Sequence, residues 1–324
     1  MPDAPAPDAL ATFLALLDLE PLEVNLFRGQ SRSPGWGRVY GGQVLAQALV
    51  AAGRTVETRE GEGTRPAHSL HAYFLLPGDV DAPIVYQVDR ARDGGSFTTR
   101  RVVAVQHGRP IFVSTVSFHR VETGLEHAAP PPQVAGPEGL MSEREMALAA
   151  APLLPARLRD VVTAEQPIEY RPVDYANPLA PTVKEPTAHL WLRATGALPD
   201  DVLVHQAVLA YASDHDLLGV AIRPHGRSFL DRTLQAASLD HAIWFHRPFR
   251  ADGWLLYAMD SPTAAGGRGF ARGTVYDADG RLVASTAQEG LLRPVDPSAG
   301  GRPDKSGPPD APAPSETGDP TTGR

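Results

Sequence analysis

The feature of this sequence that most limits its fold is an internal repeat. Three short motifs occur twice, in the same order along the chain. The pairs are FLLPGD (Phe74–Asp79) with FHRPFRAD (Phe245–Asp252), GGSFTTR (Gly94–Arg100) with GGRGFAR (Gly266–Arg272), and GRPIFVST (Gly108–Thr115) with GRLVAST (Gly280–Thr286). Chance alternation of apolar and polar residues would rarely repeat three motifs in order. The sequence therefore predicts two copies of one structural unit.

Each copy is predicted to contain one helix followed by several strands. Apolar residues at helical spacing predict helices over Gly41–Ala52 and Val204–Ser213. Strand-like runs follow at His68–Leu76, Ile84–Ala91, Phe97–Gln106 and Pro110–His119, and again at Ser238–Phe245, Trp254–Met259, Gly269–Tyr276 and Arg281–Leu292. His107-Gly108 and Ala278-Asp279-Gly280 are typical of hairpin turns. We expect an α+β fold in which each half wraps a curved antiparallel sheet around its helix, and the halves cover each other's exposed edges.

The repeat and the composition together divide the chain. A Pro-rich patch, Ala128–Pro137, separates the two similar parts. We expect an N-terminal half over 1–127, a linker with a short helix over 128–155, and a C-terminal half over 156–294. Residues 295–324 are rich in Pro, Gly, Ser and Asp, so we predict a disordered tail there.

Composition excludes several classes of protein. Hydrophobic residues make up 42% of the 324 residues, which is enough for a substantial core. The net charge of −8 argues against a nucleic-acid partner. The sequence has no cysteine, so a Cys nucleophile and a thiolate metal site are excluded. No apolar run of about 18 residues predicts a membrane span. Without a signal-like start or a peroxisomal address at the end, we expect a cytoplasmic protein.

Three polar residues stand out in the second half because they lie in apolar segments. Asp214 follows the predicted helix, Ser238 opens a predicted strand, and Gln288 lies within the last strand. A carboxylate can accept a proton, while a hydroxyl and an amide can hold a water molecule by hydrogen bonds. The plainer interpretation makes Asp214 a turn residue and Ser238 a strand end. Gln288 is harder to explain in that way, since a buried amide needs partners.

Other polar residues give weaker signals. His241 and His246 lie five apart on a predicted strand, so they should point to opposite faces and do not predict a metal site. Asp214-His215-Asp216 lacks further ligands at a recognisable spacing. The paired glycines of the repeat are not followed by Gly-Lys-Ser/Thr, and no G-x-S-x-G motif occurs. The sequence thus predicts neither a phosphate-cradling loop nor an α/β-hydrolase nucleophile.

Long stretches of the chain resemble the acyl-CoA thioesterase II family, the bacterial TesB type. The clearest are RVYGGQVLAQAL (Arg38–Leu49), HSLHAYFLLPGD (His68–Asp79), DGGSFTTRRV (Asp93–Val102), YASDHDLL (Tyr211–Leu218), SLDHAIWFHRPFRADGWLLY (Ser238–Tyr257) and GRGFARGTVYDADGRLVASTAQEG (Gly267–Gly290). The resemblance covers the chain from about Leu17 to Arg293. It implies a double hotdog fold, which agrees with the repeat found from the residues alone.

The resemblance also implies a site. In that family an Asp, a Thr or Ser, and a Gln hold the attacking water, and these match Asp214, Ser238 and Gln288. Thr is the more usual residue at the position of Ser238; Ser keeps the hydroxyl but lacks the γ-methyl that restricts χ1. The implied reaction is direct hydrolysis of acyl-CoA to a free fatty acid and CoA, with no acyl-enzyme, metal or other cofactor. A backbone N–H at a helix N-terminus would bind the oxyanion.

Further expectations concern substrate binding and assembly. We expect His241 to support the site, and Arg268, Arg272 and Arg100 to contact CoA phosphates. Aligning the repeated Ser-Thr dipeptides places Ser117 opposite Gln288, and Val50 falls near the counterpart of Asp214, so the first half should be structural. We expect one site per chain and a homodimer or homotetramer. Two alternatives stay open: a hotdog-fold enoyl-CoA hydratase, in which Gln288 would have no evident task, and a non-catalytic acyl-CoA-binding module.

Overall fold

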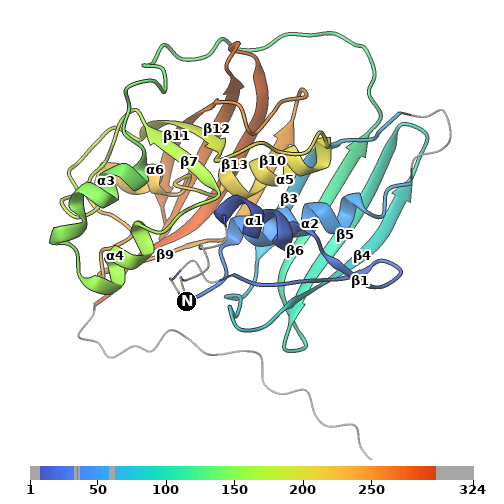
Figure 1. The fold of residues 1–324 in the computed structure, drawn as a ribbon, viewed down its shortest axis with the longest axis horizontal. Coiled ribbons are helices and arrows are strands. Elements are labelled where there is room, and N and C mark those ends of the chain that lie inside the picture. The colour runs from blue at the N-terminus through green and yellow to red at the C-terminus, as the bar shows by residue number, and fades with distance from the viewer. Residues whose placement is uncertain (1–7, 33–34, 36, 58–62, 297–324) are drawn as a thin grey trace, which may run out of the picture.

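A computed structural model of the protein describes residues 8–32, 35, 37–57 and 63–296. Helices lie on one side of a large antiparallel sheet, as the repeat predicted (Figure 1). In this view the strands of the first half lie on the right and those of the second half on the left, with the long helices in front. Part of the predicted tail, residues 297–324, lies outside the described residues.

The elements follow one another in similar order in the two halves. The first half contains α1 (Ala9–Leu17), β1 (Glu20–Glu23), β2 (Leu26–Gly29), α2 (Gly41–Gly53), β3 (Ala67–Phe74), β4 (Ile84–Asp93), β5 (Phe97–Gln106) and β6 (Arg109–His119). The connecting segment contains α3 (Glu143–Ala150), η1 (Ala151–Leu153) and α4 (Ala156–Val162). The second half contains β7 (Ile168–Pro172), β8 (Thr187–Ala194), α5 (Val202–Ser213), α6 (Gly219–Ile222), η2 (Arg223–His225), β9 (Leu234–Ser238), β10 (Asp240–Phe245), β11 (Leu255–Ala265), β12 (Arg268–Asp277) and β13 (Leu282–Pro294).

The strand order has an internal two-fold pattern. Within the described residues one 13-stranded sheet runs β1-β2-β4-β5-β6-β3-β10-β13-β12-β11-β8-β7, with β9 added beside β13. Reading outward from the central β3–β10 pair gives matching elements on both sides. The two halves therefore share one continuous sheet, and neither half leaves its central edge unpaired.

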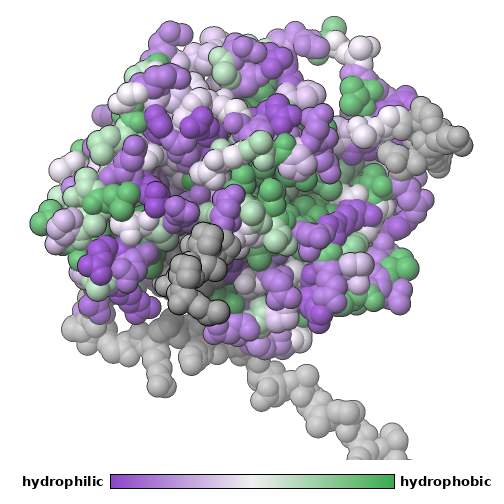
Figure 2. All heavy atoms as spheres, in the orientation of Figure 1, coloured by the Kyte–Doolittle hydropathy of each residue, from purple (hydrophilic) through white to green (hydrophobic). Residues whose placement is uncertain are grey.

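The two long helices, α2 and α5, form the centre of the core. They pack against each other, and Leu45 and Leu49 of α2 and Leu209 of α5 are fully buried. Small residues such as Ala48 and Ala210 allow the close approach. Burying each leucine contributes about 1.5–3 kcal/mol. Figure 2 shows hydrophobic residues gathered over the middle of this face, bordered by hydrophilic ones.

The residues in the hairpin turns have the positive φ angles that such turns require. His107 and Gly108, between β5 and β6, both have positive φ angles, of 50° and 72°. Two consecutive positive φ angles are typical of a hairpin turn whose twist matches its strands. Gly266 and Gly267 play the same part between β11 and β12, with φ angles of 59° and 75°. No helix in the described ranges has the length and apolar character needed to cross a membrane.

Candidate active site

The structure brings Asp214, Ser238 and Gln288 together. The Nε2 atom of Gln288 lies 2.8 Å from Oδ1 of Asp214 and 3.1 Å from Oγ of Ser238. Asp214 caps the C-terminus of α5, Ser238 ends β9, and Gln288 lies in β13 with only 1% of its surface exposed. Three elements distant in sequence thus converge on one buried amide.

The first half contributes to this cluster through a backbone group. The Oδ2 atom of Asp214 accepts a hydrogen bond from the N–H of Gly42, 2.9 Å away, at the positively polarised N-terminus of α2. A Cβ atom at Gly42 would lie 2.3 Å from the carbonyl oxygen of Tyr211, and one at Gly41 would lie 2.8 Å from Oδ2 of Asp214. Sequence reasoning missed Gly42, although the Gly41-Gly42 pair at the start of a predicted helix was a usable signal. The expectation that the first half is only structural was therefore incomplete.

A β-bulge places two residues on the same side of the sheet. Ser238 pairs with Gly290 and Ala242 pairs with Ala287, so three residues of the β9–β10 segment oppose two of β13. In a regular strand Ser238 and His241 would point to opposite faces. The extra residue lets both contact Gln288. The expectation that Ser238 opens the strand Ser238–Phe245 was wrong, because Ser238 is the last residue of β9 and β10 begins at Asp240.

His241 orients the amide of Gln288. Its Nε2 lies 3.0 Å from Oγ of Ser213, and the Ser213 hydroxyl donates to the carbonyl of Ala210. We infer that Nε2 of His241 carries the proton, so that Nδ1, 3.3 Å from Nε2 of Gln288, is an acceptor that shares one of the two amide N–H groups with the nearer oxygens of Asp214 and Ser238. Burial lowers the pKa of His241, which favours this neutral ring. Oε1 of Gln288 is buried and has no hydrogen-bond partner among the described residues.

The last turn of α5 is anchored from both halves. The hydroxyl of Tyr40 donates to the carbonyl of Tyr211, at 3.1 Å. The hydroxyl of Tyr257 donates to the carbonyl of Ser213, at 3.0 Å, and lies 2.7 Å from Oγ1 of Thr286. Burial raises the pKa of Tyr257 well above its ordinary value, so this phenol stays neutral. The carboxylate that follows α5 therefore sits on a fixed backbone.

The register of the sheet corrects the comparison of the halves. Ala72 pairs with Ser114 in the first half, and the corresponding pair in the second half is Ile243 with Thr286. This register makes Val116, not Ser117, the counterpart of Gln288. The dipeptide alignment was shifted by one residue, which in a strand reverses the facing of every side chain. The two helices end at the caps Arg54 and Asp214, so Arg54 rather than Val50 corresponds to Asp214.

The predicted contact between Arg100 and a CoA phosphate is wrong. Arg100 is fully buried, and its guanidinium makes five hydrogen bonds, among them to Oγ1 and the carbonyl of Thr55 and to Oδ1 of Asp93. Since a guanidinium has five N–H groups, none is left for a ligand. Arg100 is a structural residue.

Arg268 and Arg272 lie on β12 and are exposed. Arg268 pairs with Glu289 at 2.9 Å, and Arg272 pairs with Asp260 at 2.6 Å. A phosphate would have to compete with these carboxylates, so their contact with CoA stays a prediction. The two histidines behave as their spacing predicted: His241 is buried, whereas His246 is exposed and contacts Oγ of Ser285 at 2.9 Å. The described residues contain no cluster of three or more potential metal ligands.

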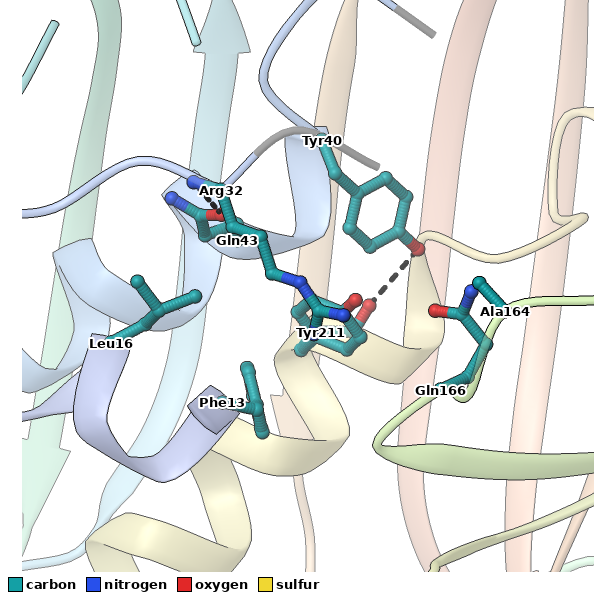
Figure 3. Close-up of a pocket in the computed structure, with 8 residues that line it drawn as sticks. All are labelled: Phe13, Leu16, Arg32, Tyr40, Gln43, Ala164, Gln166 and Tyr211. Atoms are coloured by element: carbon teal, nitrogen blue, oxygen red, sulfur yellow. Dashed lines mark hydrogen bonds between the residues drawn. The ribbon is translucent and has the colours of Figure 1, made fainter. Parts of the chain in front are cut away.

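A small cavity of about 60 Å³ adjoins the helix ends that carry the cluster (Figure 3). Its lining residues are Phe13, Leu16, Arg32, Tyr40, Gln43, Ala164, Gln166 and Tyr211. Tyr211 lies one helical turn before Asp214. Figure 3 shows the hydrogen bond from Tyr40 to the Tyr211 backbone along one side of the cavity. The cavity is therefore next to the polar cluster but not part of it.

Comparison with known proteins connects this geometry to a family. Residues 158–291 match the family model described as acyl-CoA thioesterase, and residues 30–119 match the model of the acyl-CoA thioesterase N-terminal domain. The chain is 41% identical to acyl-CoA thioesterase 2 of Haemophilus influenzae, over 88% of this chain and 98% of that protein. It is 40% identical to human acyl-coenzyme A thioesterase 8, over 86% and 88% of the two chains.

Comparison with solved structures indicates the same family and the fold. The crystal structure of the acyl-CoA thioesterase II TesB2 of Mycobacterium marinum has a TM-score of 0.69 and 41% identity, covering 87% of this chain and 98% of that one. A hot dog fold protein of Alicyclobacillus acidocaldarius, at 20% identity, has a TM-score of 0.68 over 87% and 98% of the two chains and supports the fold alone. The fold predicted from the repeat is confirmed. The chain belongs to the acyl-CoA thioesterase II family, has its double hotdog fold, and is an acyl-CoA thioester hydrolase.

Proposed function

We propose that this hydrolase cleaves acyl-CoA by direct attack of a water molecule held by Asp214, Gln288 and Ser238. The observation that carries the proposal is the meeting of the three side chains at one amide nitrogen, with distances of 2.8 and 3.1 Å. The amide can take only one orientation, because the reverse would set its oxygen against the carboxylate. Its own Oε1, buried and unpaired among the described residues, is an acceptor suited to a water O–H.

In the proposed reaction the carboxylate of Asp214 takes a proton from water as the water oxygen bonds to the thioester carbonyl carbon. The tetrahedral intermediate then breaks its carbon–sulfur bond. The proton passes from Asp214 to the departing sulfur, so one water is consumed and a carboxylic acid and CoA are released. The Oε1 of Gln288 accepts a hydrogen bond from the water, and the hydroxyl of Ser238, whose oxygen accepts from Gln288, donates its own hydrogen to the water oxygen.

We place the oxyanion at the N-terminus of α2. The N–H of Gly42 is bound to Asp214, whereas the N–H of Gly41 has no partner among the described residues. Both groups lie at the positive end of the helix, which favours a developing negative charge. This assignment gives the first half a direct part in the reaction.

A covalent route through Ser238 has less support. A nucleophilic hydroxyl needs a base within hydrogen-bonding reach. Among the described residues, the Oγ of Ser238 contacts the amide nitrogen of Gln288, which donates to it. His241, the nearest imidazole of the cluster, directs its Nδ1 to Gln288. Ser238 is therefore better suited to holding water than to attacking the substrate.

The test is release of free thiol from a panel of acyl-CoA substrates, with Asp214→Asn and Gln288→Ala beside the unchanged enzyme. Loss of thiol release in both variants supports the proposal. Intact-mass measurement of enzyme quenched during turnover should show no acyl adduct. An adduct on Ser238, or full activity of Asp214→Asn, would overturn it. Hydration of enoyl-CoA without thiol release would favour the hydratase, and binding without turnover the non-catalytic module.

We further propose that the chain forms a homodimer or homotetramer. Large apolar side chains at the end of β3 and just beyond it are exposed, with Tyr73 60% and Leu75 49% accessible. Such side chains often mark contacts between subunits. Light scattering during gel filtration would give the mass in solution, and a monomer would contradict this expectation.

A further inference from the structure

The segment that connects the two halves contacts the residue next to Asp214. Oε2 of Glu143, in α3, lies 2.9 Å from Nε2 of His215. The ring of His215 also stacks on Tyr170 of β7, with 3.9 Å between ring centroids and 15° between their planes. His215 is therefore held on two sides by residues that are distant from it in sequence. We call Glu143, His215 and Tyr170 the clasp.

Core packing does not explain α3. None of its residues is buried, although its N-terminus is well formed. Ser142 and Glu145 make a reciprocal capping box, with the Ser142 N–H 2.7 Å from Oε2 of Glu145 and the Glu145 N–H 3.2 Å from Oγ of Ser142. The cap fixes the first turn of α3, which is the turn that presents Glu143 to His215.

Charge strengthens the contact. Burial alone would lower the pKa of His215, but the carboxylate of Glu143, its hydrogen bond, and the nearby Asp216 and Asp214 outweigh this and raise the pKa to about 9. The groups that face the ring are therefore Glu143 from α3, Tyr170 from β7, and the two flanking aspartates. At neutral pH His215 is an imidazolium in an ion pair that is partly shielded from water.

The backbone around His215 connects the clasp to the site. His215 is bonded directly to Asp214, and its N–H donates to the carbonyl of Ala212, at 3.1 Å. The next residue, Asp216, has a φ of 56°, so the chain leaves the site through a tight left-handed turn. A shift of His215 would move the Asp214 carboxylate away from its 2.8 Å contact with Gln288.

We propose that Glu143 and His215 are positioning residues, by which the connecting segment sets the direction of the Asp214 carboxylate. The inference rests on the proposed function, since it assumes that Asp214 does the chemistry. Neither Glu143 nor His215 touches the reacting atoms. The connecting segment then has a task beyond joining the halves: it completes the active site from outside the double sheet.

Glu143→Gln tests the proposal because it removes the charge and keeps the shape. We expect kcat for thiol release to fall by about tenfold, with KM changed by less than about twofold, since misplacing a catalytic group affects mainly the chemical step. The alkaline limb of the kcat profile should also move to lower pH, because His215 loses its proton more easily without Glu143. Glu143→Asp, which keeps the charge, should recover kcat to within about threefold of the unchanged enzyme.

Glu165→Gln is the matched control. Glu165 follows α4 in the same part of the chain and pairs with Arg144 at 3.5 Å, and both side chains are exposed. It should leave kcat and the pH profile unchanged. Unchanged kcat and pH profile in Glu143→Gln would overturn the inference, as would the same change in Glu165→Gln or a lower melting temperature with full kcat. Asp214→Asn separates the two proposals: activity in that variant defeats the mechanism itself, whereas its loss beside a normal Glu143→Gln defeats only the clasp.

Discussion

The two halves differ in which strand carries the long polar side chain that lies beyond the C-terminus of the long helix, α2 or α5. In the first half, Arg100 of β5 pairs across the sheet with Val116 of β6. In the second half, the corresponding pair is Ala271 of β12 with Gln288 of β13. The long polar side chain has thus moved from one strand to its neighbour, and a small apolar residue stands opposite it in each case.

This difference determines whether the polar side chain beyond each helix has hydrogen-bonding groups left for a ligand. The guanidinium of Arg100 fills the space beyond α2 and bonds to Thr55, so every donor is used. Beyond α5, Ala271 leaves room for Gln288 to reach Asp214, and the Oε1 of Gln288 has no partner among the described residues. A saturated polar group makes a structural support, whereas one with spare hydrogen-bonding capacity can hold a reactant.

The largest effect on kcat is expected at Asp214, the carboxylate of the second half. Asp214→Asn should lower kcat by about 10²- to 10⁴-fold, the range for loss of a positioned base. Val116→Ala, at the first-half counterpart of Gln288, should leave thiol release per folded molecule unchanged. Measuring both with one acyl-CoA substrate tests the contrast. Equal losses in the two variants would mean that both halves carry chemistry.

A second large effect is expected on stability. Arg100→Met removes a fully buried cation and leaves Thr55 and Asp93 without its hydrogen bonds. Asp93 stays half exposed and solvated, but leaving the buried acceptors of Thr55 unpaired costs about 1–3 kcal/mol, so the free energy of unfolding in urea should fall by that amount. The kcat of the folded fraction should be kept, because Arg100 lies in the half without the cluster. A variant as stable as the original protein would refute the assignment of Arg100 as a support.

Gly42→Ala tests the hydrogen bond that the first half donates to the Asp214 carboxylate from its backbone. The added Cβ would lie 2.3 Å from the Tyr211 carbonyl, so α2 would have to move away from Asp214. We expect kcat to fall by about 100-fold, as for other small displacements of catalytic groups. Val202→Ala, at the exposed start of α5, is the control and should change kcat little. Normal activity of Gly42→Ala would show that the carboxylate is fixed without this N–H.

Sequence alone predicts most of the fold, because the elements predicted in one half can be checked against those predicted in the other half. Both long helices and the strands beyond them follow from hydrophobic period and turn residues, and they agree with the structure to within a few residues at most boundaries. The flanking strands β1, β2, β7 and β8 were not predicted. β1, β2 and β7 are short, so pairing with a neighbour rather than the residues' own pattern makes the strand. β8 is different, since its buried residues alternate with period 2 and were a usable signal.

The site was harder to predict in detail. Asp214, Ser238 and Gln288 could be named from their polarity in apolar segments and from the family resemblance. The bulge near Leu239 could not be predicted, because one extra residue does not visibly change the alternation of apolar and polar residues in so short a strand. Arg100 was misassigned because an arginine in a motif does not reveal which face of the strand it occupies. A one-residue shift in comparing the repeats hid its true counterpart, Ala271.

A smaller effect is expected from the ion pair of the second half. The pKa of His215 is raised from 6.5 to about 9, so the folded state binds its proton more tightly than the unfolded state does. The stabilisation is fully present below about pH 6.5 and is lost as the pH rises through 9. Urea unfolding between these pH values should show this loss, and Glu143→Gln should flatten it. In a first-half variant such as Val116→Ala, the free energy of unfolding should fall with pH as in the original protein. If Glu143→Gln left this fall unchanged, the pH dependence would come from groups other than His215.

The smallest effect concerns the hydroxyl of the cluster. Ser238→Thr keeps the oxygen that accepts from Gln288 and adds a methyl group that restricts χ1. We expect kcat to stay within about twofold, because the hydrogen bond is kept. Ser238→Ala removes that bond, worth about 0.5–1.5 kcal/mol, and should lower kcat by up to about tenfold. If Thr proved as harmful as Ala, space rather than hydrogen bonding would limit this position, and the bulge that turns residue 238 inward would fit only the smaller side chain.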